Sequence, residues 1–183
     1  MASPRKVSGA FTVELALVAT VLSLLLSFTG DIVVKLSMRG KLDRLSFSAV
    51  SIIKERTQLY ANVDELTQQD VDRVFSLLSD SLARTTGNYQ SNRFSGLVEE
   101  QLYDGTTALA SNQFVPSGAA SSSCRPTQSL AQIRDQVGVV TSWGRNARLY
   151  RITLCYETGS WFGQVIGSDQ FRHVSSSAVI IGR

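Results

Sequence analysis

The sequence is poor in the residues that hold metals or carry out redox chemistry. Its 183 residues include one histidine, His173, and two cysteines, Cys124 and Cys155. Structural zinc sites take four cysteine or histidine ligands, so a zinc site within one chain is excluded. The sequence also lacks a phosphate-binding loop, a dinucleotide fingerprint, a G-x-S-x-G elbow and an H-E-x-x-H motif. We therefore expect no metal, no cofactor and no catalytic residue, and we predict that the chain is not an enzyme.

The sequence also lacks a large excess of basic over acidic residues. Lysine and arginine number 18 against 15 acidic residues, and two of the basic residues, Arg5 and Lys6, precede the first apolar run. Without these two the chain carries a net charge of only +1. Binding to the phosphate backbone of nucleic acids requires a basic surface, so we predict no nucleic-acid partner. The length leaves room for one membrane segment and one domain of about 120–150 residues.

A long apolar run is present from Ala10 to Gly30. A helix over residues 10–30 would span roughly 30 Å, the thickness of the hydrocarbon core of a bilayer. Glu14 is the only charged residue in this run. A carboxylate within a bilayer costs a few kcal/mol, so Glu14 requires a partner or a special position.

Three interpretations of the first thirty residues remain open. The segment is an uncleaved anchor, or a signal peptide cut near residues 27–29, or a leader cut after Gly9. In the third case residues 1–9 form a cytoplasmic leader, and the mature chain begins at Ala10 with its apolar helix intact. Arg5 and Lys6 predict a cytoplasmic N-terminus, which places the body of the protein in an oxidising compartment. There we expect Cys124 and Cys155, which lie 31 positions apart, to form a disulfide.

Two roles are open for Glu14. In a helical assembly its carboxylate could pair with the free amine of a neighbouring subunit at Ala10, which would set the register between subunits. Alternatively, Glu14 lies only about 6 Å along the helix from Ala10 and reaches water at the cytoplasmic interface.

The apolar helix is predicted to continue beyond the membrane. No proline interrupts residues 10–60, and apolar side chains recur at helical spacing, although Gly40 could loosen the helix. We expect residues 31–60 to form an extracytoplasmic continuation of the membrane helix. The overall fold class predicted is α+β, with this long helix followed by a small domain.

Residues 61–183 are predicted to form that domain, with an antiparallel sheet. A helix is expected from an N-cap at Thr67 to a stop at Gly87, and a short helix over 129–136 with Thr127 as its cap. Strands are expected over 96–103 and 106–114, joined by a turn at Asp104-Gly105, and over 148–157, 161–167 and 175–183. Four aromatic residues are expected to fill the space between sheet and helices, or alternatively to form an exposed patch: Trp143, Trp161, Phe162 and Phe171.

The stretch Ser8–Leu15 resembles a type IV prepilin signal, with Gly9 before the cut and Glu14 at mature position five. Residues 40–46 and 53–60 resemble TadF, a minor pseudopilin family of the bacterial tight-adherence (Tad, or Flp) pilus systems. Leu15 stands where such proteins often carry an aromatic residue, and Ala10 replaces the methylated phenylalanine of many type IV pilins.

This resemblance implies a minor pilin or pseudopilin that initiates, caps or regulates pilus assembly, and thereby surface adhesion and biofilm formation. It implies cleavage between Gly9 and Ala10 by a prepilin peptidase, and a subunit contact through Glu14. The implied partners are TadE-like and Flp-like subunits and the assembly platform in the bacterial inner membrane. The implied location is that membrane, with the domain in the periplasm, or an extracellular pilus. A signal-anchored envelope scaffold protein and a type II secretion pseudopilin remain alternatives.

Overall fold

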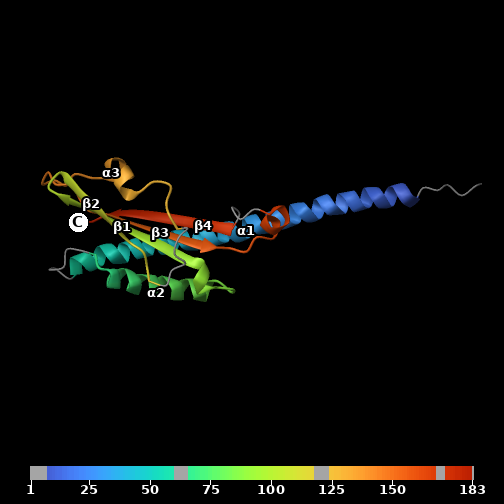
Figure 1. Cartoon of the computed structure of the whole chain (residues 1–183), viewed down its shortest axis with the longest axis horizontal. Coiled ribbons are helices and arrows are strands. Elements are labelled where there is room, and N and C mark those ends of the chain that lie inside the picture. Colours follow the sequence, from blue (N-terminus) through green and yellow to red (C-terminus); the bar gives the residue numbers. More distant parts are fainter. Residues whose placement is uncertain (1–7, 60–65, 118–123, 168–171, 183) are drawn as a thin grey trace, which may run out of the picture.

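The computed structural model describes residues 8–59, 66–117, 124–167 and 172–182. Its first element, α1 (Ser8–Leu59), is a single α-helix of 52 residues. The first half of α1 projects away from the rest of the molecule, and the second half lies along a sheet (Figure 1). The predicted long N-terminal helix is thus confirmed, and Gly40 lies within it without ending it.

A four-stranded antiparallel sheet forms the centre of the domain. Its strands are β1 (Phe94–Asp104), β2 (Thr107–Phe114), β3 (Leu149–Glu157) and β4 (His173–Ile181), in the order β2-β1-β3-β4. A 3₁₀ turn, η1 (Ser91–Arg93), leads into β1. The predicted α+β class with an antiparallel sheet is confirmed.

Two helices cover one face of the sheet. The second half of α1 packs against β3 and β4, and α2 (Gln68–Thr85) packs beside it. Side chains alternate along a strand, so every second residue of β1 and β3 faces these helices. The resulting core contains apolar residues from α1, α2 and the sheet: Leu42, Ala49, Val50, Ile53, Val71, Val74, Leu78, Leu82, Val98, Ile152 and Leu154.

The sequence signals for α2 are confirmed. The Thr67 side chain accepts a hydrogen bond from the amide of Asp70, which satisfies one of the free donors at the start of the helix. At the other end, Nζ of Lys41 donates to the carbonyl of Thr85 over 2.7 Å. This charge at the helix C-terminus also complements the helix dipole and joins α2 to α1.

The other face of the sheet carries α3 (Leu130–Val137). The residue at its N-cap is Ser129 and not Thr127 as predicted, and the Ser129 amide donates to Oε1 of Gln132 over 2.9 Å. The hairpin turn is also shifted by one residue from the prediction. Asp104 pairs with Thr107, so the two turn residues are Gly105 and Thr106. Gly105 has a φ of 62°, as a glycine in the first position of such a turn requires.

The predicted strand over 161–167 is wrong, because this segment forms the short helix α4 (Trp161–Ile166). Ser160 caps the helix, and Gly167 ends it in the left-handed conformation with a φ of 67°. A short apolar run cannot be assigned to strand or helix from periodicity alone. Trp143 and Trp161 are also exposed, at 87% and 74%, so the prediction that they fill the core is wrong. Phe171 lies outside the described residues.

Candidate functional site

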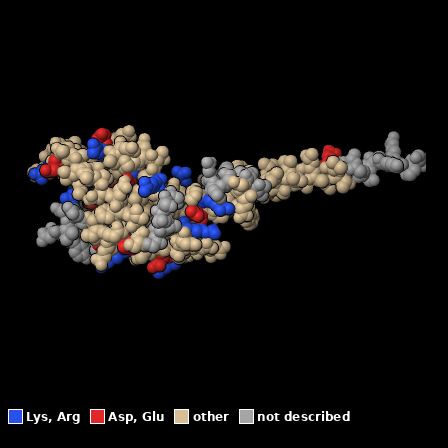
Figure 2. Space-filling model, in the orientation of Figure 1, with Lys and Arg blue, Asp and Glu red and all other residues tan. Residues whose placement is uncertain are grey.

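The first candidate site is the arm, defined here as residues 11–30 of α1. Every residue from Phe11 to Leu26 is exposed, although most of them are apolar. Figure 2 shows the arm as a nearly uncharged rod that extends from a domain with mixed charges. Among the described residues, the structure contains one helix that is long and apolar enough to cross a membrane, and the arm is its N-terminal part. Such a helix indicates a single-pass, membrane-anchored protein.

The hydroxyl groups of the arm are satisfied within the helix. Thr20, Ser23, Ser27 and Thr29 each donate to a backbone carbonyl three or four residues earlier, over 2.8–2.9 Å. Polar groups in a bilayer must find such internal partners because lipid tails offer none. These four residues therefore fit a membrane environment without help from a second protein.

Glu14 differs from them. Within the described part of the chain its carboxylate has no hydrogen-bond or ion-pair partner, and it lies on the exposed surface of the arm. An ionised carboxylate only accepts hydrogen bonds, and the amides around it are already used by the helix. Among the described residues, therefore, no group satisfies the Glu14 carboxylate.

The predicted cleavage position lies at the start of α1. The helix begins at Ser8, so the backbone of Gly9 and Ala10 is helical. Cleavage between these two residues stays a prediction.

A buried acid joins the arm to the domain. Asp31, one residue beyond the arm, is only 8% exposed. Its carboxylate accepts hydrogen bonds from the Ser160 hydroxyl at 2.7 Å and from the amides of Trp161 and Phe162 at 3.1 and 2.8 Å. The ring of Phe162 also packs edge-on against Phe28 of the arm. We call this set of contacts, from Phe28 and Asp31 to residues 160–162, the clamp.

Sequence reasoning missed the clamp. Asp31 is recognisable as the first charged residue after the apolar run, but its partners lie 129–131 positions away. Nothing in the local sequence predicts that pairing.

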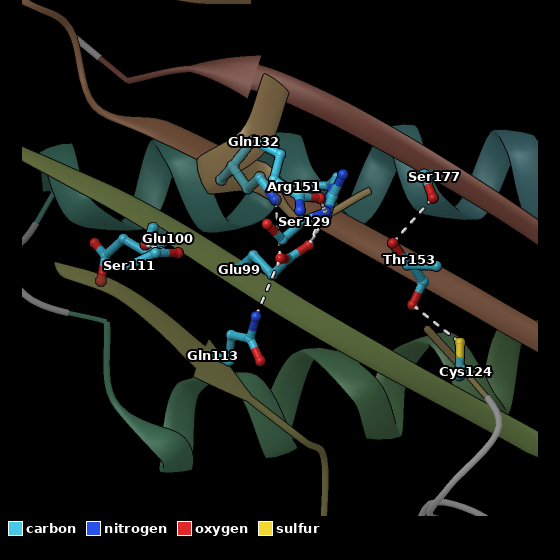
Figure 3. Close-up of polar contacts among 11 residues, drawn as sticks. Glu99, Glu100, Ser111, Gln113, Cys124, Ser129, Gln132, Arg151, Thr153 and Ser177 are labelled. Carbon is cyan, nitrogen blue, oxygen red and sulfur yellow. Dashed lines mark hydrogen bonds and ion pairs between the residues drawn. The ribbon is translucent and has the colours of Figure 1, made fainter. Parts of the chain in front are cut away.

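A second missed feature is a buried ion pair on the face of the sheet that carries α3. The guanidinium of Arg151 contacts Oε2 of Glu99, and both side chains are almost fully buried (Figure 3). Oε1 of Glu99 accepts from the Leu130 amide at 3.0 Å and from Gln113 at 3.4 Å. The pair therefore anchors the start of α3 to strands β1, β2 and β3. Its charges are engaged in the fold, which indicates a structural role.

The neighbouring acid, Glu100, points to the opposite face of β1, because consecutive side chains of a strand alternate between its two faces. It is fully buried beneath the helices. Burial raises the pKa of Glu100, and a hydrogen bond from Asn112 and the positive charge of Arg148 offset part of that rise. Glu99 and Glu100 therefore do not form a joint acid–base site.

Cys124 and Cys155 form a disulfide, with their Cα atoms 5.5 Å apart. It ties the segment that leads to α3 to strand β3. Among the described residues there is no cluster of histidine, cysteine and acidic side chains that could hold a metal ion. His173 lies at the start of β4, exposed, with Nδ1 3.8 Å from a carboxylate oxygen of Glu157.

Comparison with known proteins gives one result. A family model described as "TadF: Putative tight adherence pilin protein F" matches residues 4–183, which include the arm, the clamp and the whole domain. No curated protein and no solved structure matches the chain.

Proposed function

This chain belongs to the TadF family of tight adherence pilin proteins, and we propose that it acts as a minor pilin or pseudopilin in assembly of a Tad-type pilus. The single observation that carries the proposal is Glu14, an acid on an exposed apolar arm that has no partner among the described residues. Residues 11–26 of the arm are exposed along their whole length, so they are available to lipid before assembly and to other helices afterwards.

The proposed mechanism begins with processing. A prepilin peptidase cuts between Gly9 and Ala10, and the new amine at Ala10 remains on the helix. In the assembly this ammonium group of one subunit pairs with the Glu14 carboxylate of its neighbour. Two charges that are each costly in an apolar environment then compensate one another, and the pairing fixes the register between subunits.

Membrane topology follows from the same elements. Arg5 and Lys6 keep the leader in the cytoplasm, residues 10–30 span the inner membrane, and the domain lies in the periplasm. The disulfide between Cys124 and Cys155 supports this placement, because disulfides persist in oxidising compartments. The proposed partners are TadE-like and Flp-like subunits and the assembly platform, and the proposed outcome is surface adhesion and biofilm formation.

Complementation tests this proposal. A bacterial strain without the protein receives the wild-type chain, Glu14→Gln, or Ser23→Ala as a matched control. The Glu14→Gln substitution keeps the shape of the side chain but removes its charge, whereas Ser23 only bonds within its own helix. We expect all three proteins in the membrane fraction, with sheared surface pili lost for Glu14→Gln alone. Wild-type piliation by Glu14→Gln would refute the pairing, and wild-type piliation by the deletion strain would refute the role in assembly.

A further inference from the structure

The clamp holds an exposed tryptophan at the end of the arm. Trp161 is the first residue of α4, and its amide donates to Asp31. Its side chain is nevertheless 74% exposed. Because its amide is hydrogen-bonded to Asp31 of α1, Trp161 cannot shift along the axis of α1 without breaking the clamp.

The position of Trp161 along the axis of α1 matches the outer edge of a bilayer that the arm spans. From Glu14 to Asp31 the helix rises about 26 Å, which is close to the thickness of the hydrocarbon core. With Glu14 near the inner edge, the clamp lies at the level of the outer headgroups. Tryptophan is enriched at this level in membrane proteins, since its ring is apolar and its N–H is a donor.

The surface around the clamp changes there from apolar to basic. Val33 and Leu36, at 61% and 63% exposure, continue the apolar surface of the arm by one more turn. Arg39 is exposed one turn further along α1 and ends the apolar surface. A bilayer presents the same sequence of apolar tails, mixed interface and phosphate groups.

We propose that the clamp is a membrane-interface contact, in which Trp161 inserts among lipid headgroups and seats the domain directly on the outer surface of the membrane. The occupant is the lipid interface, because this surface is continuous with the apolar arm. The inference rests on the proposed membrane anchoring, but goes beyond it by fixing the position of the domain. The domain is thus held at one distance from the bilayer before it enters an assembly.

The chain supplies a matched control for this contact. Its second tryptophan, Trp143, is 87% exposed and lies beside Asp104, at the opposite end of β1 from Phe94. These ends are ten residue steps apart along the strand, a length of about 33 Å. Arg93, next to Phe94, lines one hollow with Asp31 and Trp161, so the Phe94 end of β1 is the end near the clamp. Trp143 therefore lies far from the proposed interface.

Trp143→Phe and Trp161→Phe variants each leave one fluorophore in the full-length chain. Both are reconstituted in vesicles of phosphatidylethanolamine and phosphatidylglycerol, with bromine on the upper acyl carbons in a parallel set. Flotation first establishes that the protein is in the membrane. We expect Trp161 emission to be blue-shifted relative to Trp143 and quenched several-fold more by the brominated lipid. Iodide in solution should quench Trp143 several-fold more than Trp161.

The possible failures are distinguishable. A protein that floats with the vesicles but shows equal quenching at both tryptophans would refute the interface contact and leave membrane anchoring intact. Trp161 shielded from iodide yet unaffected by brominated lipid would mean that protein covers it, which also refutes the proposal. A protein that does not float would refute the anchoring as well. Asp31→Ala in the Trp143→Phe background should reduce the lipid quenching of Trp161, because it releases α4.

Discussion

The adjacent acids Glu99 and Glu100 should respond in opposite ways to the same substitution. Both are fully buried, but they lie on opposite faces of β1. Glu99→Gln removes the charge that compensates Arg151, which is itself only 4% exposed. Breaking a buried ion pair by removing one partner costs about 3–5 kcal/mol, so we expect a loss of stability in that range at pH 7.

Glu100→Gln removes a charge that burial disfavours. The raised pKa of Glu100 means that the folded chain retains this proton to a higher pH than the unfolded chain does. Stability is therefore lost as pH rises from the ordinary carboxyl pKa of 4.5 through the raised value. The glutamine variant lacks this loss, and we expect it to be more stable than wild type by about 0.5–2 kcal/mol at neutral pH. Its advantage should vanish below pH 4.5, where both states of the wild type are protonated.

Urea unfolding of the full-length chain in detergent micelles, followed by near-ultraviolet circular dichroism between pH 4 and pH 8, measures both effects. Wild type, Glu99→Gln and Glu100→Gln form one series, in which the two variants are chemically matched. Equal destabilisation by both substitutions would refute the assignment of these residues to different environments. A pH-independent difference between wild type and Glu100→Gln would refute the argument from the raised pKa.

Two further predictions concern covalent and steric constraints within the domain. Replacing Cys124 and Cys155 with serine should lower the free energy of unfolding by roughly 3–4 kcal/mol, because the disulfide closes a loop of 31 positions. Urea denaturation measures this loss, and an unchanged free energy of unfolding would contradict the prediction. Gly96→Ala should cost about 1–3 kcal/mol, because its new Cβ would lie 2.9 Å from the Phe75 ring. Gly87→Ala, with open space around the position, is the control, and equal melting temperatures for the two variants would contradict the packing argument.

The parts of the fold that could be predicted from sequence are those with local signals. The apolar run and the absence of proline predicted α1, and Thr67 with the stripe from Val71 to Leu82 predicted α2. Strands β1 and β3 were recognisable from their composition and flanking turns. In each case the residues that determine the element lie within it or beside it.

The features that the sequence analysis predicted wrongly or missed depend on residues that are far apart in the chain. The segment that begins at Trp161 forms a helix because Asp31, far away in the chain, accepts hydrogen bonds from its first amides. The partners Glu99 and Arg151 are likewise 52 positions apart, and only the register of β1 against β3 brings them together. The same distinction holds for the candidate site. Glu14 could be identified from the residues around it in the sequence, whereas the clamp could be identified only from the three-dimensional structure.

The N-terminus of the mature protein tests the central claim most directly. The protein is purified from the membrane fraction of a strain with its prepilin peptidase, and its first residues and intact mass are determined. Cleavage after Gly9 predicts a chain that begins at Ala10 and keeps the whole arm, and the same protein should stay uncut without the peptidase. A chain that begins at Met1 in the peptidase-positive strain, or one that begins near Gly30, would contradict the account.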